Sequence, residues 1–260
     1  MRTTSSRPSA SLKQWVGLQS RYDIEWRDFL VKPSKPKFGN SSQPESKRNR
    51  NVRASELSPH KSVTGFAGAT KRAADVIVSA ATLILLAPAL AVIAAVVRLS
   101  DGGSVLYRQT RVGLDGHRFT IIKFRTMLEQ AERDLGAIWS VPNDPRCTRI
   151  GYYLRRSGFD ELPQLWNILR GDMSFVGPRP ERPEFTREFR REHSYYDLRH
   201  TVRPGLTGYA QVHGWRGYTS LEERLRHDLY YVRNWSFALD VRVCFATLIR
   251  GWSEKTRNGA

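Results

Sequence analysis

The sequence predicts an α/β protein, mainly α-helical, in which a re-entrant membrane helix hairpin precedes a compact, membrane-associated cytosolic domain. Three observations lead to this prediction. Residues Val76–Val97 form an uncharged apolar run, short strand-like segments follow it, and two later segments (Glu184–Arg199 and Leu221–Asn234) alternate apolar and charged residues at helical spacing. A chain of 260 residues has room for one sizeable domain with extensions.

Residues 1–66 are predicted to be a polar, basic leader without stable structure. Ser, Pro, Lys, Arg and Asn dominate this stretch, and large apolar residues are scarce from Lys32 to His60. Such a segment buries too little surface to offset the entropy lost on ordering. No apolar core follows Met1, so we expect no cleavable signal peptide.

The apolar run Val76–Val97 is long enough to cross a bilayer, because 22 helical residues span roughly 33 Å. A buried helix of a soluble protein is the alternative. Pro88 lies just past the middle of the run and is expected to kink or break the helix there. Cations stand at both ends, Lys71 and Arg72 before the run and Arg98 after it, which favours a hairpin with both ends in the cytoplasm over a kinked span.

The rest of the chain is expected to be globular. We predict strands at Ser104–Arg108 and His117–Phe124, and helices at Met127–Ile138, Thr148–Arg156 and Leu162–Leu169. The two later amphipathic segments either lie in the membrane interface or cover a soluble core. The predicted organisation is a leader (1–66), a re-entrant hairpin broken at Pro88 (67–99), a cytosolic domain (100–252) and a tail (253–260).

The residues best suited to chemistry are the adjacent carboxylates Asp160 and Glu161. Arg155 and Arg156 precede them, and Pro163 suits an early helical position. A helix N-terminus favours negative charge, so an ionised Asp there can act as a nucleophile, and a pair of acids can hold a divalent cation. The alternative is structural, because an N-cap Asp with a first-turn Glu also stabilises a helix.

The net charge of the chain limits the kinds of partner that it is expected to bind. The formal net charge of +17 favours an anionic partner, whether nucleic acid, an acidic membrane or a phosphorylated substrate. Lys123 and Arg125 form one basic cluster and Arg179, between two prolines, another; arginine suits bidentate phosphate recognition. The two cysteines and six histidines show no ligand-like spacing, and neither a P-loop nor a dinucleotide fingerprint occurs.

Several motifs in sequence order resemble the bacterial sugar transferase family, the monotopic polyprenyl-phosphate phosphoglycosyl transferases of the short type that initiates exopolysaccharide synthesis. The resemblance covers roughly Lys71 to Ile249. It is carried by Lys71-Arg72 with Asp75, Pro88, Gln109–Gly113, Lys123–Met127, Asp160–Asn167, Gly171–Pro180, Arg203–Gly208, Asp228–Tyr231 and Asp240.

The resemblance implies a two-step reaction. Asp160 would attack the β-phosphorus of a UDP-sugar and release UMP, and a polyprenyl (undecaprenyl) phosphate would then take the sugar-phosphate from the aspartate. Glu161 would be a ligand of Mg²⁺ or a general base, and Mg²⁺ would be held by Asp160 and Glu161.

The resemblance also assigns the cations and the location. Arg155 would bind the lipid phosphate, while Arg125 and Arg179 would bind donor phosphates with Lys123 nearby. The protein would lie in the bacterial cytoplasmic (inner) membrane, on its cytosolic face, with downstream glycosyltransferases as possible partners and no nucleic acid. The nature of the hexose is left open.

Two rival interpretations remain. The charge also fits a non-enzymatic, membrane-attached protein that binds nucleic acid or another partner, although the sequence contains no nucleic-acid motif. A sugar transferase that uses a single direct attack is the second rival.

Overall fold

The computed structural model describes residues 65–129, 131, 144–217 and 219–257. The leader predicted at 1–66 and the helix predicted at Met127–Ile138 lie almost wholly outside the described residues. In chain order the elements are α3 (Gly65–Asp101), β1 (Leu106–Val112), η4 (Leu114–Gly116), β2 (Arg118–Phe124), α4 (Arg149–Ser157), η5 (Phe159–Glu161), α5 (Gln164–Arg170), β3 (Ser174–Val176), α6 (Pro183–Glu192), η6 (Tyr196–Thr201), β4 (Gly205–Thr207), α7 (Tyr209–Val212), α8 (Leu221–Asn234) and α9 (Phe237–Arg257).

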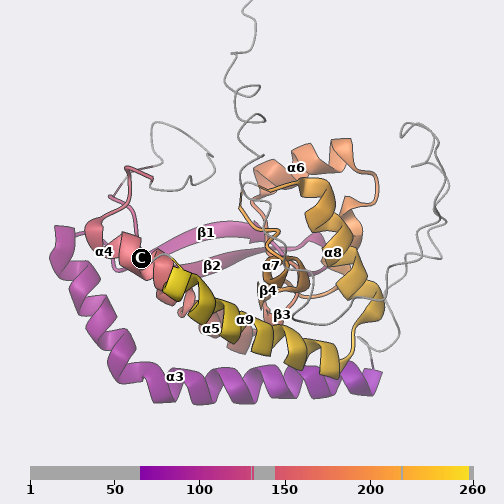
Figure 1. Ribbon diagram of the computed structural model, residues 1–260, viewed down its shortest axis with the longest axis horizontal. Helices are drawn as coiled ribbons and strands as arrows, with labels where there is room; N and C mark the ends of the chain where they lie inside the picture. The colour runs from indigo at the N-terminus through magenta and orange to yellow at the C-terminus, as the bar shows by residue number, and fades with distance from the viewer. Residues whose placement is uncertain (1–64, 130, 132–143, 218, 258–260) are drawn as a thin grey trace, which may run out of the picture. The chain divides into compact units, whose positions relative to one another are not determined.

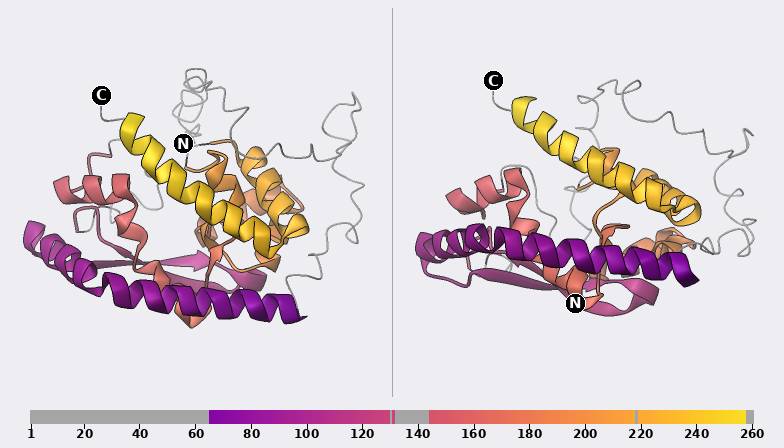
Figure 2. Two further views of the ribbon diagram at one scale, coloured as in Figure 1. Left: turned by 60° about the horizontal axis from the view of Figure 1, so that its bottom comes forward. Right: turned by 90° about the horizontal axis from the view of Figure 1, so that it is seen from below.

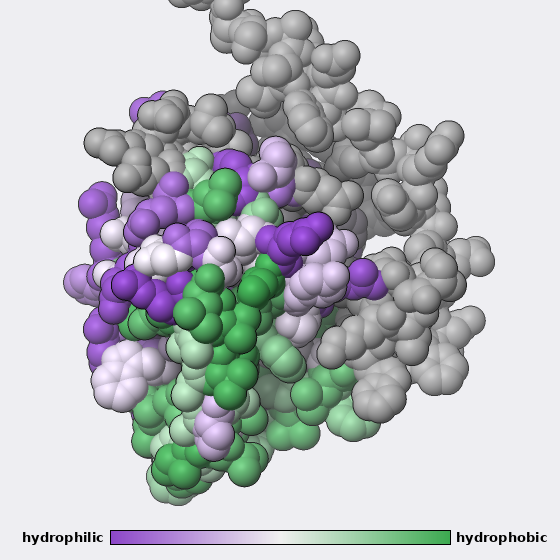
Figure 3. Space-filling view, turned by 90° about the vertical axis from the view of Figure 1, so that its left-hand side faces the viewer, coloured by the Kyte–Doolittle hydropathy of each residue, from purple (hydrophilic) through white to green (hydrophobic). Residues whose placement is uncertain are grey.

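Among the described residues, α3 is the one helix long and apolar enough to cross a membrane, judged by length and composition. Only 6% of its most apolar 18-residue stretch is buried, unlike the core helix of a soluble protein, and Ile84 and Leu85 are largely exposed. The apolar surface in the lower part of Figure 3 lies where α3 runs.

The form of α3 corrects one expectation. The helix continues without interruption through Pro88 over 37 residues, so the segment is one bent helix rather than two helices separated by a break. Figures 1 and 2 show a marked bend in its C-terminal half, the half that contains Pro88. Sharp bends in helices occur almost always where a residue such as proline removes a backbone hydrogen bond.

The first third of α3 is attached to the rest of the fold by polar contacts. Lys71 Nζ lies 2.5 Å from Asp240 Oδ2 at the start of α9. Arg72 donates to the carbonyls of Ile168 and Leu169 at 2.5 and 2.7 Å, near the C-terminus of α5. Asp75 is buried and accepts a hydrogen bond from the backbone N–H of residue 175 at 3.1 Å.

The two predicted strands are confirmed, and they pair as an antiparallel β-hairpin. β1 and β2 are antiparallel, with Leu106 opposite Phe124 and Val112 opposite Arg118. The reversal uses the one described non-glycine residue with a positive φ, Asp115 (50°), because aspartate tolerates the left-handed region better than most residues. The first strand extends further towards the turn than predicted. The helices predicted around Thr148–Arg156 and Leu162–Leu169 are present as α4 and α5.

A second, parallel pair of short strands was not predicted. β3 pairs with β4, with Ser174 opposite Gly205 and Val176 opposite Thr207. Glycine is needed at 205, because a Cβ there would overlap the backbone of Gly177. This pair brings the loop after β3 beside the loop before α7.

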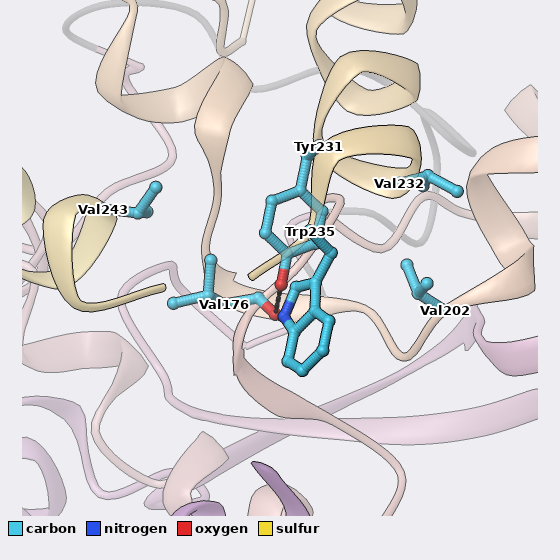
Figure 4. Close-up of a cluster of buried hydrophobic side chains, with 6 residues drawn as sticks. All are labelled: Val176, Val202, Tyr231, Val232, Trp235 and Val243. Atoms are coloured by element: carbon cyan, nitrogen blue, oxygen red, sulfur yellow. Dashed lines mark hydrogen bonds between the residues drawn. The ribbon is translucent and has the colours of Figure 1, made fainter. Parts of the chain in front are cut away.

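α8 and α9 enclose a core cluster on β3 (Figure 4), which consists of Val176, Val202, Tyr231, Val232, Trp235 and Val243. The Tyr231 hydroxyl donates to the carbonyl of Val176 at 2.9 Å, and Trp235 Nε1 donates to Asp240 Oδ2 at 3.0 Å. Because Lys71 contacts the same Asp240 carboxylate, this core also anchors α3.

The two predicted amphipathic segments pack on the core in different ways. The first is divided into α6 and η6, and the second matches α8 at both ends. On α8 the apolar side chains Leu225, Leu229 and Val232 are buried. The exposed apolar row lies on α9 instead, at Phe237, Val241, Phe245 and Leu248, and α9 extends beyond residue 252, where the domain was expected to end.

Candidate active site

Asp160 and Glu161 lie in the single turn of η5, between the end of α4 and the start of α5. Gly158, with φ 75°, ends α4 and turns the chain into η5. The residue that caps α5 is Pro163, and no side-chain cap bond is present at either helix start. The structural alternative, in which Asp160 is an N-cap, therefore does not describe this site.

Glu161 is held by two cations from distant parts of the chain. Its Oε1 lies 2.6 Å from Lys123 Nζ and 2.6 Å from Arg179 Nη2. Burial alone would raise the pKa of Glu161, but Arg179 and Lys123 outweigh it and keep the pKa well below its usual range. Glu161 is therefore ionised at any physiological pH, and it is a poor proton acceptor near neutrality.

Asp160 has the opposite character. It is 8% exposed, and no described residue donates a hydrogen bond to its carboxylate. Burial raises the pKa of Asp160 to about 6, with the charge of Glu161 adding to the effect and Lys123, Arg155 and Arg179 opposing it. At pH 7 the carboxylate is mostly ionised, and no hydrogen bond from a described residue ties up its oxygens, which suits a nucleophile.

Arg155 reaches the site from the last turn of α4, where its position is set by Thr126. Arg155 Nε donates to Thr126 Oγ1 at 2.7 Å, and the N–H of Thr148 donates to the carbonyl of Thr126 at 3.0 Å. A Cβ at Gly151 would overlap the Thr126 backbone, so α4 packs directly on this residue. This positioning role of Thr126 was not predicted from the sequence.

Arg125 lies in the same cluster as Lys123 but makes different contacts. β2 ends at Phe124, and the Arg125 side chain is buried in an ion pair with Asp101 at the end of α3. Its Nε also donates to the carbonyl of Ser104 at 2.6 Å. The structure thus brings Lys123, Arg155 and Arg179 to the acidic pair, and it engages Arg125 in anchoring α3.

Asn167 fixes α5 against β2, a role that sequence reasoning missed. The side chain is fully buried; its Oδ1 accepts from the N–H of Ile122 at 3.1 Å and its Nδ2 donates to the carbonyl of Thr120 at 2.7 Å. The Asn167 amide thereby supplies a donor and an acceptor to the free edge of β2, as a neighbouring strand would. The consequence is that Lys123 and the acidic pair face each other at a fixed separation.

The donor set suits magnesium better than a transition metal. Among the described residues no group of three or more His, Cys, Asp and Glu could hold a metal. The site does hold two adjacent carboxylates, and one of them receives no hydrogen bond from the part of the chain that the structure describes. Mg²⁺ is commonly bound by one or two carboxylates together with water and substrate phosphates, so the residues fit that ion.

Comparison with known proteins matches residues 66–254 to the family described as bacterial sugar transferase. The chain is 43% identical over 189 residues to a UDP-glucose:undecaprenyl-phosphate glucose-1-phosphate transferase of Escherichia coli K12, covering 71% of this chain and 40% of that protein. It is 42% identical over 201 residues to the exopolysaccharide production protein PSS of Rhizobium leguminosarum bv. phaseoli, covering 72% of this chain and 96% of that protein.

A third relative differs in its sugar. The chain is 40% identical over 180 residues to a UDP-N-acetylgalactosamine-undecaprenyl-phosphate N-acetylgalactosaminephosphotransferase of Aeromonas hydrophila, covering 68% of this chain and 42% of that protein. The chain thus spans about two fifths of the length of the E. coli and Aeromonas proteins and nearly all of PSS. The family match covers far more than half of the sequence, and the chain belongs to the bacterial sugar transferase family.

Proposed function

We propose that this chain transfers a sugar-1-phosphate from a UDP-sugar to polyprenyl (undecaprenyl) phosphate and releases UMP, the first membrane step of exopolysaccharide or related glycan synthesis. The relatives' names support this reaction class. The structural observation that carries the proposal is the division between the two acids. Glu161 is fixed by Lys123 and Arg179, while Asp160 has a pKa of about 6 and no described hydrogen-bond donor.

The reaction proceeds in two displacements at the β-phosphorus of the donor. A carboxylate oxygen of Asp160 forms a bond to that phosphorus, and the bond from phosphorus to the oxygen shared with the α-phosphate breaks, so that UMP leaves with that oxygen. The sugar-1-phosphate is then an acyl phosphate on Asp160. An oxygen of the lipid phosphate attacks the same phosphorus, and Asp160 leaves as a carboxylate.

The cations around the pair have distinct tasks in this proposal. Lys123 and Arg179 face the donor phosphates, where charge on the phosphoryl oxygens must be balanced, and Arg155 faces the lipid phosphate. Arg125 contributes to donor binding only indirectly, by fixing the end of β2. The low pKa of Glu161 favours a role as a ligand of Mg²⁺ over a role as general base. Mg²⁺, when bound by Asp160 and Glu161, supplies further charge neutralisation.

We further propose that α3 enters the inner membrane from the cytosol and returns to the same side at its bend. Its apolar middle is exposed, and basic side chains stand at both ends, Lys71 and Arg72 before it and Arg98 after it. Partners in this setting are the soluble UDP-sugar, the lipid acceptor, and glycosyltransferases that extend the lipid-linked sugar.

A labelled-donor assay tests the function. Membranes or purified protein are incubated with UDP-sugars carrying a radiolabelled hexose and with undecaprenyl phosphate, and lipid-linked label and UMP are measured. We expect both products from the wild type and neither from Asp160→Ala. Asp144→Asn, which alters another buried carboxylate outside the acidic pair, serves as the control and should retain activity. Wild-type rates from Asp160→Ala, or no lipid-linked product from any UDP-sugar, would contradict the proposal.

The covalent step is tested separately. Incubation with labelled donor in the absence of lipid should leave labelled sugar-phosphate on the peptide that contains Asp160, together with one equivalent of UMP. If product forms normally but no label is trapped and no UMP burst occurs, the transfer is a single direct attack.

A further inference from the structure

The backbone around Arg179 is held by an unusual set of donors. Four successive carbonyls, those of residues 178–181, each accept a hydrogen bond, and the donors come from three parts of the chain. The carbonyls of 178 and 181 accept from the N–H groups of Gly205 and Val112, both at 3.0 Å. The carbonyl of 180 accepts from Arg111 Nη1 at 3.1 Å, and that of Arg179 accepts from Arg199 Nη2 at 2.8 Å. The peptide of Arg179 thus depends on a side-chain donor.

That donor is itself fixed by a buried carboxylate. Arg199, on η6, directs Nε and Nη2 to Asp228 Oδ2 at 3.0 and 2.7 Å, and its Nη1 donates to the hydroxyl of Tyr196 at 2.8 Å. The side chains of Arg199 and Asp228 are only 2% and 3% exposed. Three of these four hydrogen bonds therefore orient the guanidinium, and the fourth reaches the carbonyl of Arg179.

Stability alone gives a weak account of this pair. Removing two charges from water costs several kcal/mol for each ion, and well-packed apolar residues of the same volume often stabilise a fold equally well. A planar guanidinium held by a carboxylate does offer something that apolar residues do not, namely a donor in a fixed direction. Here that donor meets the carbonyl of the residue whose side chain contacts Glu161 at 2.6 Å.

We propose that Asp228 and Arg199 are positioning residues, which act through the Arg179 peptide to aim the Arg179 guanidinium at the acidic pair and at the donor phosphates. The proposal rests on the proposed function for its kinetic consequences. Its structural part, that α8 and η6 hold the Arg179 loop, stands on the contacts alone. Neither Asp228 nor Arg199 touches a substrate in this account.

The first test measures the loop and needs no turnover. Hydrogen–deuterium exchange is followed for the peptide that contains Gly177, whose N–H donates to the carbonyl of Thr207 at 3.0 Å. Asp228→Asn and Arg199→Lys should both accelerate exchange there. Asp144→Asn is the matched control, because Asp144 is equally buried and paired with Arg146 at 2.6 Å, outside this network. Unchanged exchange in both variants would overturn the proposal.

The second test is a double-mutant cycle on donor turnover. We expect Asp228→Asn to lower kcat/KM for the UDP-sugar about 10- to 100-fold, the range typical of residues that orient a functional group, with little change in the KM for the lipid. In an Arg179→Ala background the same substitution should have less than about a twofold effect, because the group it orients is gone. An equal loss in both backgrounds would show a general structural role and would overturn the proposal.

A third variant covers the case in which single substitutions fail to fold. The double variant Arg199→Met/Asp228→Leu removes both charges together and leaves no unpaired ion in the core. It should fold, show fast exchange around Gly177 and lose donor turnover like Asp228→Asn; full donor turnover in this folded variant would contradict the proposal. If the wild type forms no lipid-linked sugar, the proposed function fails, and the exchange measurements still decide the positioning role.

Discussion

Glu161 and Lys123 meet at 2.6 Å although 38 residues separate them along the chain. The contact joins the end of β2 to η5, and it leaves the neighbouring Asp160 as the carboxylate without a described donor. Two adjacent acids thus acquire pKa values shifted in opposite directions by their surroundings, a division typical of sites in which each acid has its own task.

Replacing Lys123 by methionine should move the pH profile of the enzyme to higher pH. In the wild type, kcat/KM should rise as pH increases through about 6, because Asp160 must lose its proton to attack. Lys123 is the largest of the cationic influences that lower this pKa, so Lys123→Met should shift the rise upward. UMP release is measured from pH 5 to 9 at fixed Mg²⁺. Lys123→Arg keeps the charge and should shift the profile less; identical profiles for all three proteins would contradict this assignment.

Asp160→Asn should abolish transfer and stabilise the fold at neutral pH. The pKa of Asp160 is raised on folding, so the folded state retains the proton between about pH 4 and 6 while the unfolded state loses it. The contribution to stability is therefore present below pH 4 and lost as pH rises through 6. At pH 7.5 we expect the free energy of unfolding of Asp160→Asn to exceed that of the wild type by about 3 kcal/mol, from a shift of about two pKa units.

Denaturant unfolding in detergent measures this difference. The difference should shrink as pH falls from 6 to 4 and vanish about one unit lower, where the wild-type carboxyl is protonated in both states. A variant less stable than the wild type at pH 7.5 would mean that the charged form of Asp160 is stabilised by its surroundings.

Asn167→Ala should destabilise the domain and weaken activity through β2. The substitution removes the donor and the acceptor that meet Thr120 and Ile122, and it leaves buried backbone groups unpaired. Two such losses cost roughly 2–4 kcal/mol. Trp166→Ala changes the adjacent, 54% exposed residue and should alter the unfolding free energy far less. Equal effects from the two variants would argue against the proposed bond between α5 and β2.

Cysteine labelling should place both ends of α3 on the cytosolic side. Thr70 and Ser100 are exposed and lie on either side of the apolar stretch, and in both the hydroxyl bonds only within the helix or to its neighbour. With Cys147 and Cys244 replaced by serine, a membrane-impermeant reagent should label Cys at 70 or at 100 only after the cells are opened. Labelling of one position in intact cells would show a true span.

Removal of divalent cations should stop the reaction. Chelation with EDTA is expected to abolish UMP release, and added Mg²⁺ should restore it, because Mg²⁺ is commonly bound by one or two carboxylates together with substrate phosphates, and the acidic pair would supply those carboxylates. Glu161→Gln should raise the Mg²⁺ concentration needed for half-maximal activity. Full activity in EDTA would exclude the metal role assigned to the pair.

Much of the fold followed from local patterns in the sequence. The helix at Leu221–Asn234 was predicted with its observed ends from the helical spacing of its apolar and charged residues. In the structure Ser220 caps it through the N–H of Glu223. The two strands of the hairpin β1–β2 were also predicted from local sequence. The pairing of β3 with β4 did not, because strands of three residues carry almost no periodic signal and their partners are about 30 residues apart.

The sequence predicted which residues gather at the site better than it predicted their contacts. Asp160, Glu161, Lys123, Arg155 and Arg179 do come together, but the sequence held no sign that Arg125 would turn to Asp101. The direction of the Arg125 side chain depends on where β2 ends. One residue beyond a strand, side chains no longer alternate between the two faces. The helix α9 was not predicted from the sequence either. It carries apolar residues on its buried face, such as Val243, and on its exposed face, such as Phe245, so no single stripe marks it as amphipathic.

The contact of Arg72 with the last carbonyls of α5 has a mechanical consequence. The acidic pair stands just before the first turn of that helix, whose seven residues span roughly 10 Å. If α3 enters a bilayer, the contact of Arg72 therefore fixes the distance between the reactive carboxylate and the point where α3 enters the membrane. A thicker or thinner membrane would then change how α3 is accommodated while the nucleophile keeps its distance from the point of entry.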